Sequence, residues 1–237
     1  MLTSIVSIER FEGQVIPFDY NYYLAISVYS KLKFYQEEIK PLHQVNQPGI
    51  HTISNIISRN AKHHDKGLDI SKGFFILRSI DKRIGTYLRL GISLDPNLRI
   101  ANSLYTVKAV NESEGRLNGR SDVRFKTLSP VLVRNFENKK LFVDEVGKVE
   151  NNLNLVMKWT LKNQFGLGEN IVNDLRINVS KAAPKTIRIS GRPANESITR
   201  AFDLSGNISG NPGVLEVIYH RGLGSKTGLG LGCWETL

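Results

Sequence analysis

The residues best suited to chemistry lie in a glycine-rich stretch, RGLGSKTGLGLGCWETL (221–237), which has Ser225, Lys226 and Thr227 at its centre. Glycine at this density indicates backbone that bends freely or is approached closely by another group. Bare amides and a lysine both suit an anion such as phosphate. A Walker loop is excluded because Ser225, rather than glycine, precedes the lysine. A dinucleotide fingerprint is not expected, because too few residues follow Gly232 for the helix it requires.

Histidine is the other residue type that suits acid–base chemistry, because its pKa lies near neutrality. His43 lies in a polar connection, whereas His51 begins an expected strand and is either a half-buried strand residue or a functional group. Tyr29 shares a helical face with other apolar residues, so it is either a core aromatic or a functional phenol. The adjacent His63 and His64 are interpreted as solvated loop residues. We therefore expect neither a metal site nor a cofactor.

The elements that must position these residues follow from hydrophobic periodicity and turn signals. In the first half, the pattern predicts a strand, a helix, two strands, a helix weakened by Gly85 and Gly91, and a closing strand. The ranges are 2–8, 20–36, 50–57, 73–80, 81–94 and 99–110. This order, βαββαβ, is the ferredoxin-like arrangement.

The second half repeats the pattern without a residue-level repeat. A polar, glycine-bearing segment at 111–119 is the predicted domain boundary. It is followed by a strand from 122, a helix over 145–165, two strands within 175–191 separated near 181–185, a strand over 198–206, a short helix and a final strand. We therefore predict an α+β protein of two tandem ferredoxin-like domains, 1–115 and 116–237, with a C-terminal glycine-rich loop.

Charge is the most informative property of the composition. The formal net charge is +10, with +3 in residues 1–115 and +7 in residues 116–237. Such a surplus favours a polyanionic partner, most commonly nucleic acid, although a basic surface without that role is the alternative. No apolar run is long enough to span a bilayer and no leader is recognised, which predicts a cytoplasmic protein. The single cysteine, Cys233, is expected to be a buried apolar residue.

Several segments together resemble one family of nucleic-acid enzymes. They are IPFDYNYYLAISVYSKL, LHQVNQPGIHTIS, KGFFILRS, TLSPVLVR and GLGSKTGLGLG, in that order along the chain. The terminal loop alone is similar to that of the repeat-associated RAMP superfamily. The combination resembles the Cas6 family of CRISPR-associated endoribonucleases, which cut precursor CRISPR RNA within its repeats.

The resemblance implies a metal-independent reaction in which a ribose 2′-OH attacks the adjacent phosphate, leaving a cyclic phosphate and a 5′-OH. By position, His43 matches the family's catalytic histidine and Tyr29 its helical tyrosine, with His51 a further catalytic candidate. Some members carry a lysine where this chain has Gly49, so the stabilising cation must come from elsewhere or be absent. Lys226 and Lys40 are the candidates.

The resemblance also implies that the partner is CRISPR repeat RNA and that other subunits of a CRISPR effector complex are further candidate partners. The oligomeric state is left open between a monomer and a homodimer. The loop is expected to hold RNA or to pack the two halves together. The expected RNA-binding residues are Lys226, Gly224, Ser225, Lys181, Lys185, Arg188, Arg192, Arg124 and Lys126. Two alternatives remain: a non-catalytic RNA-binding protein of the same superfamily, and a nucleotide-binding enzyme that uses the loop.

Overall fold

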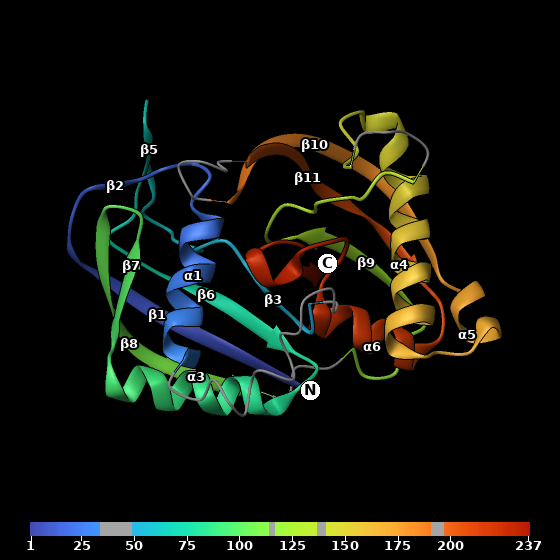
Figure 1. The fold of residues 1–237 in the computed structure, drawn as a ribbon, viewed down its shortest axis with the longest axis horizontal. Coiled ribbons are helices and arrows are strands. Elements are labelled where there is room, and N and C mark those ends of the chain that lie inside the picture. Colours follow the sequence, from blue (N-terminus) through green and yellow to red (C-terminus); the bar gives the residue numbers. More distant parts are fainter. Residues whose placement is uncertain (34–48, 114–116, 137–140, 191–196) are drawn as a thin grey trace.

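The structure is a computed structural model that describes residues 1–33, 49–113, 117–136, 141–190 and 197–237. Each half of the chain forms its own antiparallel sheet, and the two sheets occupy opposite sides of the view in Figure 1. The last residues of the chain, drawn in red, lie between them. Within the described ranges, no helix combines the length and apolar character that a bilayer crossing requires.

The first sheet has the strand order β3-β6-β1-β8-β7. Its central strands are β1 and β6, which are the first and third strands of a βαββαβ unit, with β3 and β8 on either side. This is the ferredoxin-like order that the sequence predicts. The bounds are β1 Leu2–Glu12, β3 His51–Ile53, β6 Lys72–Ser79, β7 Asn97–Ile100 and β8 Ser103–Ser113.

Two helices, α1 (Asn21–Leu32) and α3 (Lys82–Leu94), pack on this sheet and close the first core. The two glycines of α3 allow close approach. A Cβ on Gly85 would lie 1.8 Å from Leu2, and one on Gly91 would lie 2.1 Å from the carbonyl oxygen of Lys31. Their cost in helix propensity, about 1 kcal/mol each, is therefore offset by tight packing against β1 and α1.

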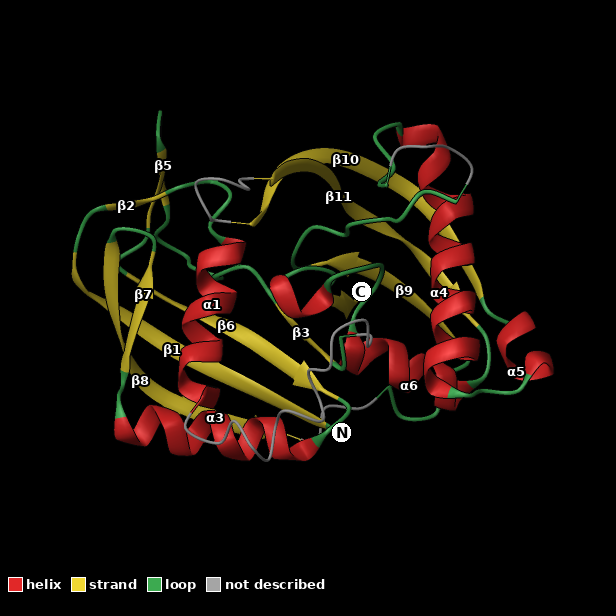
Figure 2. Cartoon of the chain, viewed as in Figure 1, coloured by secondary structure: helices red, strands yellow, loops and turns green. Residues whose placement is uncertain are grey.

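The second sheet has the order β10-β11-β9-β12, so the first and third strands of the unit are again central. Its helices cover one face, as Figure 2 shows for α4 and α6. Residue Gly166 ends α4 in the left-handed conformation, with φ 65°, as a glycine C-terminal to a helix usually does. The bounds are β9 Asp122–Thr127, α4 Val149–Phe165, α5 Glu169–Asn173, β10 Arg176–Ser190, β11 Ser197–Ser209, α6 Pro212–Arg221 and β12 Trp234–Thr236.

Shorter elements complete the architecture. A small sheet of β2 (Val15–Ile16), β5 (Gly67–Asp69) and β4 (Lys62–His64) extends from the first domain. The 3₁₀ turn η3 (Val146–Lys148) precedes α4. A second one, η5 (Thr227–Leu229), lies within the glycine-rich loop. The predicted domain division at 115/116 falls in 114–116, outside the described residues, and stays a prediction.

Two details of the strand prediction are wrong. The segment 175–191 is not two strands but the continuous β10, with Pro184 inside it. Since β10 is an edge strand, the missing N–H of Pro184 need not interrupt the pairing with β11. The segment 99–110 is not one strand, because Ala101 turns with φ 52° between β7 and β8.

Candidate functional site

Two of the predicted catalytic side chains meet where α1 passes the edge strand β3. The hydroxyl of Tyr29 lies 3.0 Å from Nε2 of His51, and their rings pack edge to face with centroids 5.5 Å apart. Tyr29 is in the last turns of α1, whereas His51 opens β3 and pairs with Ser79 of β6. The sheet therefore fixes His51, and the helix brings the phenol to it.

The glycine-rich loop covers this pair. A Cβ on Gly228 would lie 2.4 Å from the Tyr29 hydroxyl and 3.3 Å from the His51 ring, so a side chain there would displace the pair. The loop is tied to the first domain at two points: Asn21 donates to the carbonyl of Gly230 at 2.9 Å, and Thr52 donates to that of Leu231 at 2.7 Å. The end of the second domain thus completes a site in the first.

Burial keeps the Tyr29 phenol protonated. Tyr29 is largely enclosed, and loss of hydration raises its pKa above the ordinary value because the charged phenolate is disfavoured. The phenol is therefore a neutral hydrogen-bonding group at physiological pH. His51 is 1% exposed, so Tyr29 is the more accessible member of the pair.

A buried arginine lies close to the position at which the sequence departs from the family. Arg221, the last residue of α6, is 2% exposed, and its Nε donates to the carbonyl of Gly49 at 3.3 Å. A Cβ on Gly49 would itself lie 2.3 Å from Oγ1 of Thr227. Gly49, which precedes His51, thus packs against both the glycine-rich loop and the guanidinium of Arg221. Arg221 was missed in the sequence, where its only signal was its place directly before the first glycine of the loop.

The predicted loop residues have unlike environments. Lys226 is exposed in the left-handed conformation with φ 53°. Ser225 is half-buried and its amide donates to Leu132 at 2.8 Å. Gly224 is buried, and its amide points at the sulfur of Met157, 3.3 Å away. Only Lys226 and Ser225 therefore present polar groups toward the surface.

Three of the predicted basic residues share the face of the second sheet opposite its helices. The register places Lys181, Ser205 and Lys126 in one row, and Arg124 in the next row on the same face. Lys126 pairs with Glu235 at 3.0 Å, which removes part of the positive charge.

Two other strand residues are paired with carboxylates. Lys185 lies 3.6 Å from Asp203. Arg188 donates to Asp19 at 2.9 Å and lies over the ring of Tyr23, which ties β10 to the start of α1. Arg188 is therefore a structural contact between the domains.

His43 and Arg192 lie outside the described residues, as does Lys40, and their assignments remain predictions. His63 and His64 are exposed on β4. Across the described ranges, no group of three side chains has the spacing of a metal site. Cys233 is buried, as predicted.

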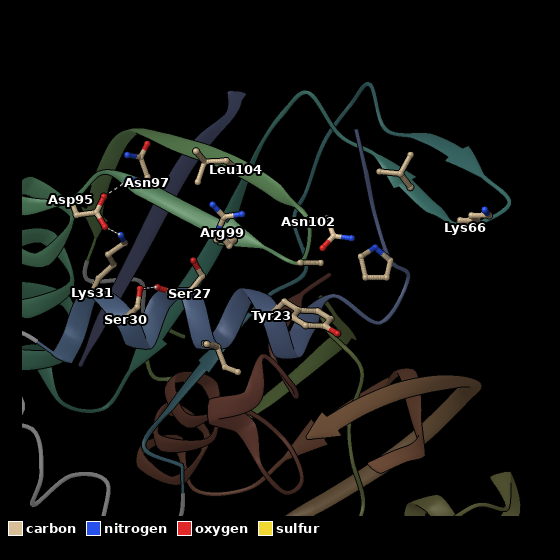
Figure 3. A pocket seen from close by; sticks show the side chains of 14 residues that line it. Tyr23, Ser27, Ser30, Lys31, Lys66, Asp95, Asn97, Arg99, Asn102 and Leu104 are labelled. Atoms are coloured by element: carbon tan, nitrogen blue, oxygen red, sulfur yellow. Dashed lines mark hydrogen bonds and ion pairs between the residues drawn. The ribbon is translucent and has the colours of Figure 1, made fainter. Parts of the chain in front are cut away.

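A cavity of about 780 Å³ lies on another side of α1 (Figure 3). Lys31 and Asp95 form an ion pair at one end of it, at 2.5 Å. Arg99 and Asn102 approach it from β7 and the turn that follows, and Tyr23 from α1. Neither Tyr29 nor His51 is among its described lining residues, so it is separate from the site under the loop.

The chain has two tandem ferredoxin-like domains and a glycine-rich loop before the last strand. This is the RAMP fold. Within the class of proteins with this fold, the chain belongs to the Cas6 family. The family model described as CRISPR associated protein Cas6, C-terminal, matches residues 111–236, and the model for the Cas6 N-terminal region matches residues 15–111. The resemblance in the sequence is thereby confirmed.

Individual relatives are similar over nearly the whole chain. The CRISPR-associated endoribonuclease Cas6 of Pyrococcus furiosus is 27% identical over 92% of this chain and 82% of its own length. A CRISPR-associated endoribonuclease-like protein, Cas6nc, of Pyrococcus horikoshii is 26% identical over 93% of both chains. A solved structure described as a RAMP protein binding different RNA substrates superposes with a TM-score of 0.84 at 23% identity, covering 100% of both chains.

Proposed function

We propose that this protein is an endoribonuclease that processes CRISPR repeat RNA into guide RNA without a metal ion. Family membership and the names of the relatives support the substrate class. The observation that carries the proposal is the contact between Tyr29 and His51 beneath Gly228. This contact joins two groups that can transfer protons or donate hydrogen bonds. A basic surplus of +10 suits a polyanionic substrate.

The reaction is a transesterification within the RNA. The 2′-oxygen forms a bond to the adjacent phosphorus, the bond from phosphorus to the 5′-oxygen breaks, and the products carry a 2′,3′-cyclic phosphate and a 5′-OH. A base takes the 2′-proton and an acid protonates the departing 5′-oxygen, each contributing about 10² to 10⁴-fold. His43 fills one of these roles, as the resemblance implies.

Tyr29 and His51 support this step at the phosphate. As a neutral phenol, Tyr29 donates a hydrogen bond to the phosphate oxygens as charge builds on them. His51 lies deeper and holds the phenol in place in the tautomer whose Nε2–H donates to the phenol oxygen, which leaves the phenol proton for the phosphate. Arg221, whose Nε donates to the carbonyl of Gly49, places a buried positive charge beside the position where some members of the family carry a lysine.

The test is incubation with the cognate repeat RNA in excess EDTA, followed by analysis of the product ends. We expect cleavage to persist, to leave a cyclic phosphate, and to stop when the scissile nucleotide is 2′-deoxy. A metal requirement, or cleavage of the 2′-deoxy RNA, would refute this mechanism. The variant His43→Ala is expected to bind the repeat and to lose cleavage.

The second candidate function is repeat binding without cleavage. Two observations favour it: His51 is 1% exposed, and Gly49 replaces a cation that other members use. One relative is also named only as endoribonuclease-like. Tight binding of intact repeat RNA with no product over a long incubation would establish this function instead.

A further inference from the structure

A small cavity adjoins the Tyr29–His51 pair on the far side of Gly49. It has a volume of about 180 Å³ and lies between α4 and the first part of the glycine-rich loop. Gly49 lines it, and Gly49 also packs against Thr227, which directly precedes the Gly228 that covers the pair. Gly49 and the segment Thr227–Gly228 thus lie between the cavity and the proposed reaction centre.

Its described lining residues carry positive charge and no acid. Arg134, Arg221 and Lys226 all line it, and no aspartate or glutamate does among those residues. Its volume is below the roughly 300 Å³ at which ordinary small-molecule pockets begin. An anionic group with one flat ring fits such a space better than a larger ligand.

Arg221 is a cation that the described protein leaves without a counter-charge. It is 2% exposed, and burial lowers its pKa to about 10, so it remains protonated at neutral pH. Its Nε and Nη1 make all of its hydrogen bonds to described residues, chiefly to the carbonyls of Gly49, Gly222 and Gly224. No carboxylate of the described chain pairs with it. A buried charge of this kind is stabilised by an incoming anion.

Two aromatic residues, Trp159 and Phe136, line the same cavity. Trp159 of α4 and Phe136 are each 44% exposed, so both rings are open to solvent. The guanidinium of Arg134 lies 5.8 Å from the centre of the Phe136 ring. Aromatic faces beside fixed cations are the arrangement that unpaired nucleotides recognise.

We infer that this cavity binds one unpaired nucleotide of the RNA next to the scissile phosphate, with its base stacked on Trp159 and its phosphate on Arg221 and Lys226. This inference rests on the proposed function, because it assumes that RNA passes under the loop. It assigns α4 a direct part in holding the substrate. The nucleotide is anchored on one side of Gly49 while the bond beside it lies against Tyr29.

Intrinsic fluorescence tests the stacking contact directly. The chain has two tryptophans, and Trp234 is 0% exposed, so Trp159 is the one that a ligand can reach. We expect repeat RNA with a 2′-deoxy scissile nucleotide to quench the Trp159 emission. The same RNA with an abasic nucleotide flanking the scissile bond is expected to bind without that quench. Equal quenching by the abasic RNA, or no quenching by either, overturns the inference.

Variants test the energetics. Trp159→Ala is expected to weaken binding of the uncleavable RNA about tenfold, within the range for one stacked base. Leu155→Ala is the matched control, because Leu155 lies one turn earlier on α4, is 42% exposed and does not line the cavity. Equal affinities for the two variants would overturn the stacking contact.

The charge contact has its own measurement. Lys226→Ala is expected to reduce the slope of log affinity against log salt by about 0.7, the value for one phosphate contact on a single strand. Lys162→Ala is the control, since Lys162 pairs with Glu169 on α4 and lies outside the cavity. An unchanged slope for Lys226→Ala contradicts the assigned phosphate contact.

These outcomes separate the inference from the proposed function. Quenching and weaker binding by Trp159→Ala, without any cleavage by the parent protein, would leave the nucleotide site standing and reject the nuclease. Cleavage by the parent, with Trp159→Ala binding and cutting equally well, would reject the nucleotide site alone. Mononucleotide binding as tight as RNA binding would indicate a site for free nucleotides and overturn the inference.

Discussion

Substituting alanine for Gly228 tests whether the glycine-rich loop positions the proposed catalytic groups. The backbone at Gly228 is not in the positive-φ region, so alanine adopts it without strain. The new Cβ would lie 2.4 Å from the Tyr29 hydroxyl, and ordinary contact begins at 3.4 Å. The hydroxyl must therefore move by the difference, 1.0 Å, away from the loop.

That displacement is large for catalysis and small for stability. Moving the hydroxyl alters its 3.0 Å hydrogen bond with His51, and a misplacement of about 1 Å can cost about 10²-fold in rate. The clash falls on the far end of a flexible side chain, and Gly→Ala itself favours folding by about 0.4 to 1 kcal/mol. We therefore expect Gly228→Ala to lose about 10²-fold in cleavage while the melting temperature stays nearly unchanged.

A double-mutant cycle identifies the cause. Tyr29→Phe removes the oxygen that the new Cβ would meet, so Gly228→Ala is expected to cost less than about threefold in that background, a coupling of about 2 kcal/mol. The assay is single-turnover cleavage of labelled repeat RNA, with thermal melts of every variant. Gly147→Ala is the control, because a Cβ there meets nothing within 4 Å.

Two results would refute this reasoning. Equal losses from Gly228→Ala in the parent and in the Tyr29→Phe background would show that the loop does not act through the hydroxyl. A loss of cleavage that tracks a fall in melting temperature would show that the substitution acts through folding.

Three further predictions concern other parts of the chain. Asp95→Asn leaves the buried Lys31 without its carboxylate and is expected to cost about 1 to 2 kcal/mol at neutral pH. The hydrogen bond from Lys31 holds the pKa of Asp95 below its usual value, so this stabilisation is present above about pH 4 and is lost as pH falls through the depressed pKa. Replacing Lys126 and Lys181 together by alanine is expected to lower the salt slope of RNA binding by about 1.4, measured by titration at several salt concentrations. Cys233, buried and with its pKa raised by desolvation, is expected to react with iodoacetamide only at the rate of unfolding.

Each of these has a control and a contradicting outcome. Asp65→Asn, at an exposed position, should leave the melts unchanged, and a gap between Asp95→Asn and the parent that does not shrink as the pH is lowered below 4 would contradict the ion-pair argument. Alanine at Lys162, outside this sheet, serves as the control for the salt slope, and equal slopes would remove the sheet from the RNA path. Rapid alkylation of the folded protein would contradict the burial of Cys233.

Much of the fold was predictable because hydrophobic periodicity is local. The order βαββαβ in each half, the helix near 149–165 and the short helix before the loop all follow from patterns within ten to twenty residues. One of the two errors, at 175–191, arose because position in the sheet decided the outcome. Pro184 interrupts a central strand but not an edge strand, and the sequence alone does not state that β10 is at the edge.

The candidate site was predictable only in its parts. Tyr29 and His51 were both named from the sequence, but their contact joins residues 22 positions apart and depends on how α1 packs against β3. Arg221 and Trp159 were not named as site residues. Arg221 is the last residue of α6, and Trp159 is an exposed residue on α4. Only the cavity that both residues line gives them a shared role.

By itself, the sequence determined the charge surplus, the order of the elements and the membership in the Cas6 family, because composition, periodicity and motifs are properties of the chain. The tertiary structure decided which loop glycine covers the Tyr29–His51 pair and which cation lies beside Gly49. The physical reason is that Gly228 and Arg221 come from the end of the second domain. They reach the first domain only when buried hydrogen bonds from Asn21 and Thr52 fix the loop against it.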